Sequence, residues 1–143
     1  MRIALILILI LINWTSVKPL LAEVEYLKAK QTKKLSHLEQ AVKLDPLQSM
    51  YVLKLAHLYQ RREPHKALAY LQRAIVTATG DSVRWMPFFQ RGNLEMRLGN
   101  VYGARESFKK SLYYWPLFVP AQKALANVNE VIKEHSQILI RFK

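Results

Sequence analysis

The side chains that most often carry out chemistry in proteins are few in this sequence and lie far apart along it. The chain has no cysteine, and its four histidines, His37, His57, His65 and His135, show none of the spacings that hold a metal ion. The ten acidic residues form no pair that would point inward together. No phosphate-binding glycine loop, His-Glu-x-x-His pair or Gly-x-Ser-x-Gly turn is present. The sequence therefore predicts a protein that is not an enzyme and that uses no cofactor or metal.

Positive charge is the main chemical property that remains. The sequence has 22 lysines and arginines against 10 acidic residues, a formal net charge of +12. Such a surface favours anionic neighbours, which include lipid headgroups, acidic glycans, nucleic acids and acidic proteins, with a strength that depends on salt. The basic residues are dispersed, with no run denser than pairs such as Lys33 and Lys34 or Arg61 and Arg62. This dispersion disfavours a nucleic-acid partner and leaves a protein or peptide, in particular an acidic one, as the expected partner.

The amino terminus of the chain is apolar, and the helices that would position these charges are expected to begin after it. One arginine precedes ten apolar residues, Ile3 to Ile12, and apolar character continues with interruptions to Ala22. A secretory signal has a charged start, an apolar run and a small residue at the cleavage point, whereas a membrane-spanning helix needs about 20 mainly apolar residues. We expect residues 1–22 to form an uncleaved signal-anchor or transmembrane segment, with a cleaved signal or a helix packed on the domain as alternatives.

Two features of the sequence favour opposite orientations of such an anchor in the membrane. A signal-type start places residues 23–143 outside the cytoplasm, in the periplasm or at the cell surface. The lysines that follow the apolar segment favour the opposite orientation. We prefer the extracytoplasmic location.

Beyond residue 22 the apolar spacing is helical, and small residues recur at a fixed interval. Gaps of 4, 7, 5, 4, 3 and 5 separate seven positions, which are Phe88, Gly92, Gly99, Ala104, Phe108, Ser111 and Pro116. Gaps of 4, 11, 4, 3 and 5 separate six earlier ones, which are Val52, Ala56, Ala67, Leu71, Ala74 and Thr79. The pattern predicts helix pairs of about 34 residues at 48–79 and 82–116, a pair begun before residue 46, and a closing helix from about Pro120 to His135.

The residue types at these positions have a physical explanation. Ala56, Gly92 and Ala126 are small where the first helix of a pair approaches its partner closely. Gly99 is expected to end a helix in the left-handed conformation. Pro116 follows the second helix of its pair because proline cannot continue a helix.

This pattern resembles the tetratricopeptide-repeat family over roughly Tyr26 to Asn129, and its best unit is residues 85–118, with Phe88 where the family often has tryptophan. The resemblance implies an all-α superhelix of antiparallel helix pairs, about three units within residues 23–143, behind an N-terminal apolar helix. The sequence departs from the family pattern in three places. Lys34 stands where a small residue is usual, Thr79 replaces the closing proline, and "TGDSV" is expected to lengthen the connection before the third unit.

The resemblance also implies a concave surface, built from the first helix of each pair, that holds a peptide or a helix. Offsets from the small packing residues place ten residues on it, which are Leu53, His57, Gln60, Arg61, Phe89, Asn93, Met96, Arg97, Lys123 and Asn127. Asn93 and Asn127 are equivalent, and peptide-binding family members often place asparagine there to bond the ligand backbone, with lysine or arginine nearby for carboxylates. The alternative is that these asparagines are polar residues on an exposed helix face.

For three sets of apolar residues, the sequence raises the question of what covers them. Phe89 and Met96 would be covered by a partner, by the N-terminal segment or by the tail "ILIRFK", which itself either caps the stack or adds to a partner. The segment "YYWPLF", Tyr113 to Phe118, is interpreted as packing between units, with contact to sugars or a membrane surface as the alternative.

The sequence thus predicts a membrane-tethered, non-enzymatic adaptor that binds a protein partner through a concave helical surface. One alternative rests on "LDPLQSMYVLKLAHLYQ", which resembles the helical-repeat tail behind the last membrane span of some bacterial surface-glycan ligases and polymerases of the O-antigen type. The chain would then be a detached or accessory version of that tail. A nucleic-acid-binding repeat protein is a further alternative, and oligomerisation could complete the apolar face.

Overall fold

The computed structural model describes the backbone of residues 2–141 and the side chains of residues 14–80 and 82–138. Within this part of the chain there are seven helices and no strand. The helices are α1 (Arg2–Thr32), α2 (Leu35–Leu44), α3 (Ser49–Tyr59), α4 (Pro64–Thr77), α5 (Asp81–Arg97), α6 (Val101–Tyr114) and α7 (Val119–Arg141). This architecture confirms the predicted all-α class and the predicted order of helix pairs.

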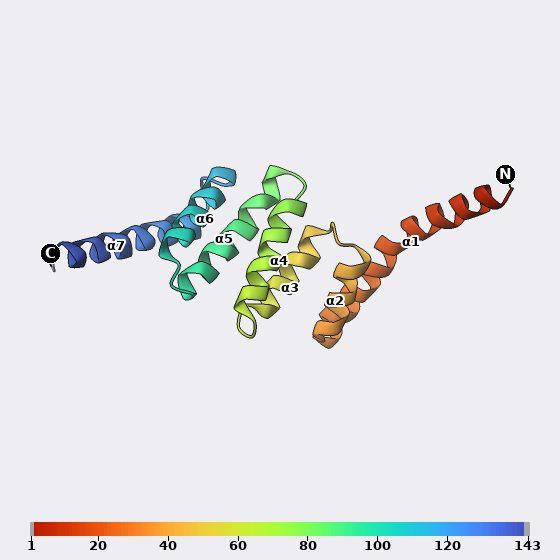
Figure 1. Ribbon diagram of the computed structural model, residues 1–143, viewed down its shortest axis with the longest axis horizontal. Helices are drawn as coiled ribbons and strands as arrows, with labels where there is room; N and C mark the ends of the chain where they lie inside the picture. The colour runs from red at the N-terminus through yellow and green to blue at the C-terminus, as the bar shows by residue number, and fades with distance from the viewer. Residues whose placement is uncertain (1, 142–143) are drawn as a thin grey trace.

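Each helix packs mainly against the helices before and after it along the chain. Figure 1 shows the result, an elongated row in which α1 and α2, α3 and α4, and α5 and α6 form three successive antiparallel pairs. Helix α7 follows as a single closing helix. The first part of α1 and the last part of α7 project from opposite ends of the row, so the two termini lie far apart (Figure 1).

Small residues permit the close approach of helices within each pair. Ala56 of α3 and Ala67 of α4 are fully buried. At Gly92 of α5 an added Cβ atom would lie 2.6 Å from the ring of Phe108 of α6, which is nearer than a real Cβ contact allows. Only glycine therefore lets the Phe108 ring lie against the α5 backbone.

The helix ends follow the predicted signals. Gly99 has a φ of 77° and ends α5 in the left-handed region. The next residue, Asn100, caps α6, because its side-chain Oδ1 accepts a hydrogen bond from the backbone N–H of Gly103 at 3.1 Å. Helix α6 ends at Tyr114, two residues before Pro116.

Two clusters of buried side chains lie along the row. The first extends from α1 to α5 and includes Ala22, Leu38 and Leu94. The second is smaller and is formed by α6 and α7, with Ala104, Phe108 and Val128 fully buried. The core of this protein is thus a line of inter-helix contacts, as expected for stacked helix pairs.

The departures from the repeat pattern have local structural causes. Lys34 is exposed and precedes α2 as its N-cap residue, so no neighbouring helix requires a small side chain there. The expected longer loop at "TGDSV" is wrong, because only residues 78–80 connect α4 and α5. The extra residues instead lengthen α5, which has 17 residues where α3 has 11.

The closing helix also differs from the expectation. Ala126 is exposed, although it is equivalent to Ala56 and Gly92, because no second helix follows α7 within the described residues. Helix α7 continues without a break to Arg141, and Ile138 is half exposed on it. The described backbone of the tail therefore does not fold back to cap the stack.

The amino-terminal prediction falls largely on residues whose side chains lie outside the described part. This holds for the whole run from Ile3 to Ile12. Among the residues that the structure describes, no helix is long and apolar enough to cross a membrane. At the other end of the predicted 1–22 segment, Ala22 is fully buried in the first cluster.

Candidate functional site

A groove of about 360 Å³ opens between the first two helix pairs, and we call it the lysine groove. It is lined by Tyr26, Ala29, Lys30, Lys33, Lys34, Leu38, Lys54, His57 and Leu58. Its apolar members include Leu38, which is buried, whereas its four lysines are exposed. No acidic residue lines the groove, and no described acidic side chain forms an ion pair with any of these lysines. The groove therefore combines an apolar surface with uncompensated positive charge.

The turn between α1 and α2 brings three of these lysines together. Lys33 has a φ of 54°, a left-handed conformation that non-glycine residues rarely adopt, and its backbone N–H donates to the carbonyl of Ala29 at 2.9 Å. This geometry ends α1 as a glycine would, at a cost of about 1 kcal/mol for a residue with a Cβ atom. Thr32 Oγ1 accepts the backbone N–H of Lys34 at 3.4 Å and donates to the carbonyl of Lys28 at 2.8 Å.

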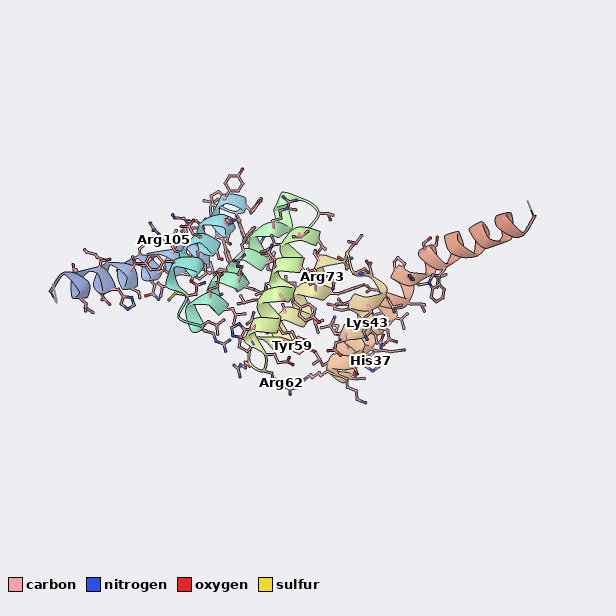
Figure 2. The ribbon with its side chains drawn as sticks, viewed as in Figure 1. His37, Lys43, Tyr59, Arg62, Arg73 and Arg105 are labelled. Atoms are coloured by element: carbon pink, nitrogen blue, oxygen red, sulfur yellow. The ribbon has the colours of Figure 1, made fainter. Side chains whose placement is uncertain are left out.

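Beside this turn, a carboxylate links the two helices of the first pair. Glu25 of α1 accepts from His37 Nδ1 of α2 at 2.7 Å and from Lys28 Nζ at 2.8 Å. Hydrogen bonds from Lys28 and then His37 lower the pKa of the Glu25 carboxyl. The position of His37 on α2 is labelled in Figure 2.

Two tyrosine hydroxyls link neighbouring pairs across the same region. The Tyr51 hydroxyl of α3 donates to Glu23 of α1, and its ring stacks on Tyr26 with centroids 4.9 Å apart. Burial and then the Glu23 carboxylate raise the pKa of Tyr51. The Tyr59 hydroxyl donates to Glu39 of α2, and this hydrogen bond raises the pKa of Tyr59. These contacts hold α1 and α2 against α3 and so fix the two sides of the lysine groove.

The ten residues that the sequence places on the concave surface lie at three depths. Leu53 is buried in the first cluster, and Gln60, Phe89 and Met96 are half-buried. The exposed ones are His57, Arg61, Asn93, Arg97, Lys123 and Asn127. Of the ten, His57 alone lines the lysine groove.

The structure also shows what covers Phe89 and Met96. Both pack on the second cluster, and the Phe89 ring lies 5.8 Å from the Phe108 ring and 4.9 Å from the Phe118 ring. Their cover therefore comes from α6, α7 and the connection between them, and no described residue of the N-terminal segment or of the tail belongs to this cluster.

The lysines that line the groove were not among the predicted site residues. Lys33 and Lys34 were noted for their charge, and Lys34 also as a departure from the repeat pattern, but neither these lysines nor Lys30 and Lys54 were placed on the binding surface. The signal that could have found them is Lys34, a long cation at a position where the repeat pattern asks for a small residue.

A buried carboxylate lies in the third pair, at some distance along the chain from the lysine groove. Glu95 of α5 is 3% exposed, and it accepts from Arg91 Nε at 2.9 Å and from Ser107 Oγ of α6 at 2.6 Å. These two donors compensate its charge, so Glu95 acts as a link between α5 and α6. No group of three His, Asp or Glu side chains that could hold a metal ion occurs in the described part of the chain.

The "YYWPLF" segment packs partly against neighbouring aromatic rings and lies partly at the surface. Trp115 and Phe118 stack with centroids 4.9 Å apart, and the Trp85 ring lies within 4.7 Å of both. Tyr113 and Leu117 are instead about four-fifths exposed, at 79% and 80%. The segment therefore packs α5 against the end of α6 and leaves Tyr113, Leu117 and part of the Trp115 ring at the surface.

Comparisons with known proteins identify the fold. No protein-family model matches the sequence, and no curated protein matches it. The crystal structure of MamA superposes with a TM-score of 0.63 at 17% identity, over 87% of this chain and 67% of that one. The first TPR domain of Spaghetti (RPAP3), bound to the HSP90 peptide SRMEEVD, gives 0.64 at 15% identity, over 85% and 94%.

A third similar structure is the second TPR domain of human RPAP3, in complex with the HSP70 peptide SGPTIEEVD. It superposes with a TM-score of 0.65 at 16% identity, over 80% of this chain and 98% of that domain. At these identities the similarity concerns the fold. The chain has the tetratricopeptide-repeat fold, in agreement with the repeat pattern of its sequence.

Proposed function

We propose that this tetratricopeptide-repeat chain is an adaptor without catalytic activity, which binds an acidic peptide segment of a protein partner in the lysine groove. The observation that carries the proposal is the set of four lysines without acidic partners around an apolar groove surface. Helix-repeat domains offer preformed surfaces of this kind to extended peptides. The peptides named for the two RPAP3 domains are themselves acidic, which supports the same ligand class here.

The chemistry of the groove specifies what a ligand must carry. Carboxylates would form charge-assisted hydrogen bonds with the ammonium groups of Lys33, Lys34 and Lys54. An apolar side chain of the ligand would cover Tyr26 and Leu58. The net charge of +12 would increase the rate of encounter with an acidic partner and make that rate sensitive to salt.

The proposal is tested with the peptide SRMEEVD as an acidic probe and calorimetric titration of the full chain. We expect saturable binding that weakens with added salt. Changing Lys33→Glu and Lys54→Glu together should weaken it at least about tenfold, because two attractive contacts become repulsive. The matched control is Lys133→Glu, an exposed charge reversal on α7, which should leave the affinity within about twofold. Equal affinities for the groove variant and the control would refute the site.

Tethering to a membrane through residues 1–22 is a second part of the proposal. It is supported by the apolar run Ile3 to Ile12 and by large apolar side chains exposed along α1. These are Trp14 at 54%, Leu20 at 66%, Leu21 at 39%, Val24 at 41% and Leu27 at 48% exposure. Interfacial tryptophan and a nearby lysine are typical of membrane-bound helices, and Lys18 lies next to the Trp14 ring at 5.8 Å.

The tether is tested by deleting residues 2–12, which leaves the buried Ala22 in place. We expect the full chain in the membrane fraction and the shortened chain in the soluble fraction, with the helix content per residue of the rest of the chain preserved. If both chains fractionate alike, the tether is refuted and the adaptor proposal is unaffected. An accessory role beside a membrane-embedded glycan ligase or polymerase is the alternative, and it predicts co-purification with such an enzyme from native membranes.

A further inference from the structure

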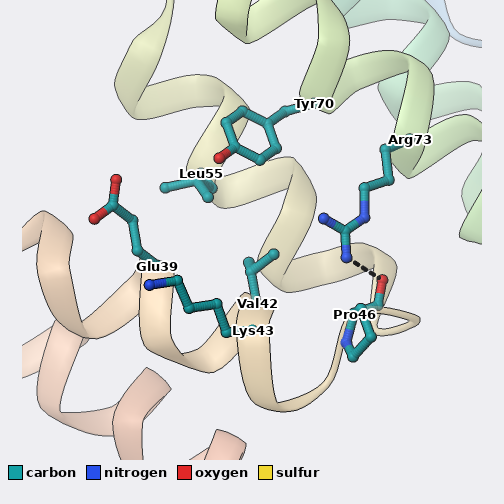
Figure 3. Close-up of a pocket in the computed structure, with 7 residues that line it drawn as sticks. All are labelled: Glu39, Val42, Lys43, Pro46, Leu55, Tyr70 and Arg73. Carbon is teal, nitrogen blue, oxygen red and sulfur yellow. Dashed lines mark hydrogen bonds between the residues drawn. The ribbon is translucent and has the colours of Figure 1, made fainter.

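A second pocket, which we call the outer pocket, lies between the second helices of the first two pairs and shares no residue with the lysine groove. Its volume is about 390 Å³, within the range of about 300 to 1,000 Å³ that is usual for small-ligand sites. Figure 3 shows its lining, which consists of Glu39, Val42, Lys43, Pro46, Leu55, Tyr70 and Arg73.

The outer pocket is lined by both polar and apolar side chains, and its apolar part is held in place. Val42 of α2 and Leu55 of α3 are 4% and 1% exposed. The Tyr70 ring of α4 forms a wall, and it stacks on the Tyr59 ring with centroids 5.6 Å apart and planes 12° apart. Val42 and Leu55 expose almost no surface of their own, so a ligand in this pocket would meet chiefly the Tyr70 ring, which favours a compact apolar body.

A guanidinium group is oriented at one end of the pocket. Arg73 is half-buried, and one of its Nη atoms donates to the backbone carbonyl of Pro46 at 3.1 Å (Figure 3). A guanidinium has five N–H donors, and no described carboxylate lies within ion-pair distance of Arg73 or of Lys43. The Arg73 guanidinium is thus available to an anion from outside the chain, whereas the Lys43 ammonium lies beside Glu39 at the other side of the pocket (Figure 3).

The charges that line the pocket limit the ligand to one negative charge. Lys43 and Arg73 supply two positive charges, and Glu39, whose carboxylate accepts the Tyr59 hydroxyl, supplies one negative charge. A single planar carboxylate matches the remaining positive charge and the fork of the guanidinium, whereas a dianion would be repelled by Glu39.

We propose that the outer pocket binds a monocarboxylate with a compact apolar body. Its carboxylate lies against Arg73, across the pocket from Lys43 and Glu39 (Figure 3), and its apolar body lies on the Tyr70 ring. A free acid and the C-terminal residue of a peptide that ends in an apolar side chain offer the same chemistry. This site is independent of the peptide site proposed in the lysine groove.

The test titrates the full chain with two acids, 3-phenylpropionate and acetyl-Gly-Phe, and with the carboxamide of each, followed by NMR. We expect at least one acid to bind saturably, with shifts at Val42, Leu55 and Tyr70, and its carboxamide to bind at least about tenfold more weakly. Tighter binding of 3-phenylpropionate would identify the ligand as a free acid, and tighter binding of acetyl-Gly-Phe would identify it as the end of a peptide.

Variants then locate the carboxylate. Arg73→Gln should weaken binding at least about tenfold, and Lys43→Gln by a smaller factor, because the lysine is more exposed. Arg62→Gln is the matched control, since Arg62 is exposed in the turn between α3 and α4 (Figure 2) and does not line the pocket. Because Arg73→Gln also removes the bond to Pro46, helix content and melting temperature are measured for each variant. Val42→Ile provides a separate readout, because it narrows the pocket without changing its charge and should weaken the binding of both acids, each of which carries a phenyl group.

Four results would overturn the proposal. They are the absence of saturable binding by both acids, equal binding of acid and carboxamide, unchanged affinity in Arg73→Gln, and loss of acid binding in the double variant of the lysine groove, Lys33→Glu with Lys54→Glu. The last result would assign the acid to the other site.

Discussion

The first two helix pairs and the last three helices use the same repeat but leave different surfaces. Between α1 and α3 the lysine groove stays open, with charged side chains around its apolar surface. Between α5 and α7, Phe89 and Met96 pack on the second cluster together with Leu125 and Ile132 of α7. The helix pairing is common to both regions, so the side chains that fill the space between neighbouring pairs decide whether a groove remains.

The largest expected effect concerns the contact that pairs α5 with α6. Gly92→Val should destabilise the protein by about 3 kcal/mol, because even a Cβ atom would overlap the buried Phe108 ring. The matched change is Ala126→Val at the equivalent but exposed position of α7, which should alter stability by less than about 0.5 kcal/mol. Urea denaturation of both variants measures the difference. Similar losses would contradict the conclusion that α7 lacks a partner on that side.

The next effect separates stability from binding in the first region. Lys33→Gly should stabilise the protein by about 1 kcal/mol, because glycine adopts the left-handed conformation without a Cβ clash. The same change removes a cation from the lysine groove and should weaken the binding of SRMEEVD. Thermal melting and peptide titration of one variant test both expectations. A stabilised variant with unaltered affinity would remove Lys33 from the binding site.

A smaller effect is expected at the asparagines that the sequence singled out. Asn93→Ala with Asn127→Ala should weaken peptide capture about threefold, through loss of hydrogen bonds to the ligand backbone, with unchanged helix content. The comparison is with the Lys33→Glu and Lys54→Glu double variant, whose affinity for the peptide should fall at least about tenfold. If the asparagine variant lost more peptide affinity than the lysine variant, the main binding site would lie on the last three helices and not in the first region.

The smallest effect depends on pH. Because hydrogen bonds lower the pKa of Glu25, this carboxyl stabilises the folded state above its unfolded pKa, and the contribution is lost as the pH falls through the lower, folded value. Glu25→Gln should therefore reduce the dependence of the melting temperature on pH on the acidic side of the carboxyl range. The variant and the parent protein are compared by circular dichroism. Identical profiles would show that the link between α1 and α2 carries no pH-dependent stability.

The helix pairs could be predicted because close packing restricts the residues that fit. A position such as Gly92 tolerates no side chain against Phe108, and Gly99 adopts a left-handed conformation, so both leave a signal in the sequence. These requirements recur with each unit and define the repeat. Ala126 shows the limit of the argument, since its type matches the pattern although the helix that would explain it is absent from the described residues.

The candidate site was less predictable for a physical reason. Mapping by fixed offsets assumes that every unit has the same turn, but the first turn lies at Lys33 and Lys34, with α2 beginning only at Leu35. A position such as Phe89 is open or filled according to side chains from other parts of the chain, here Phe108 of α6 and Phe118 of the connection to α7. Whether a groove is open therefore depends on contacts that local spacing does not encode.

The burial of Ala22 has a consequence for the maturation of the chain. A protease that cut directly after this alanine would remove it from the first pair and leave Glu23, the acceptor for Tyr51, as the new amino-terminal residue. The α1 segment that remained would lack the close contact that Ala22 makes in the core. A polypeptide that keeps an intact first repeat must therefore escape processing at this peptide bond.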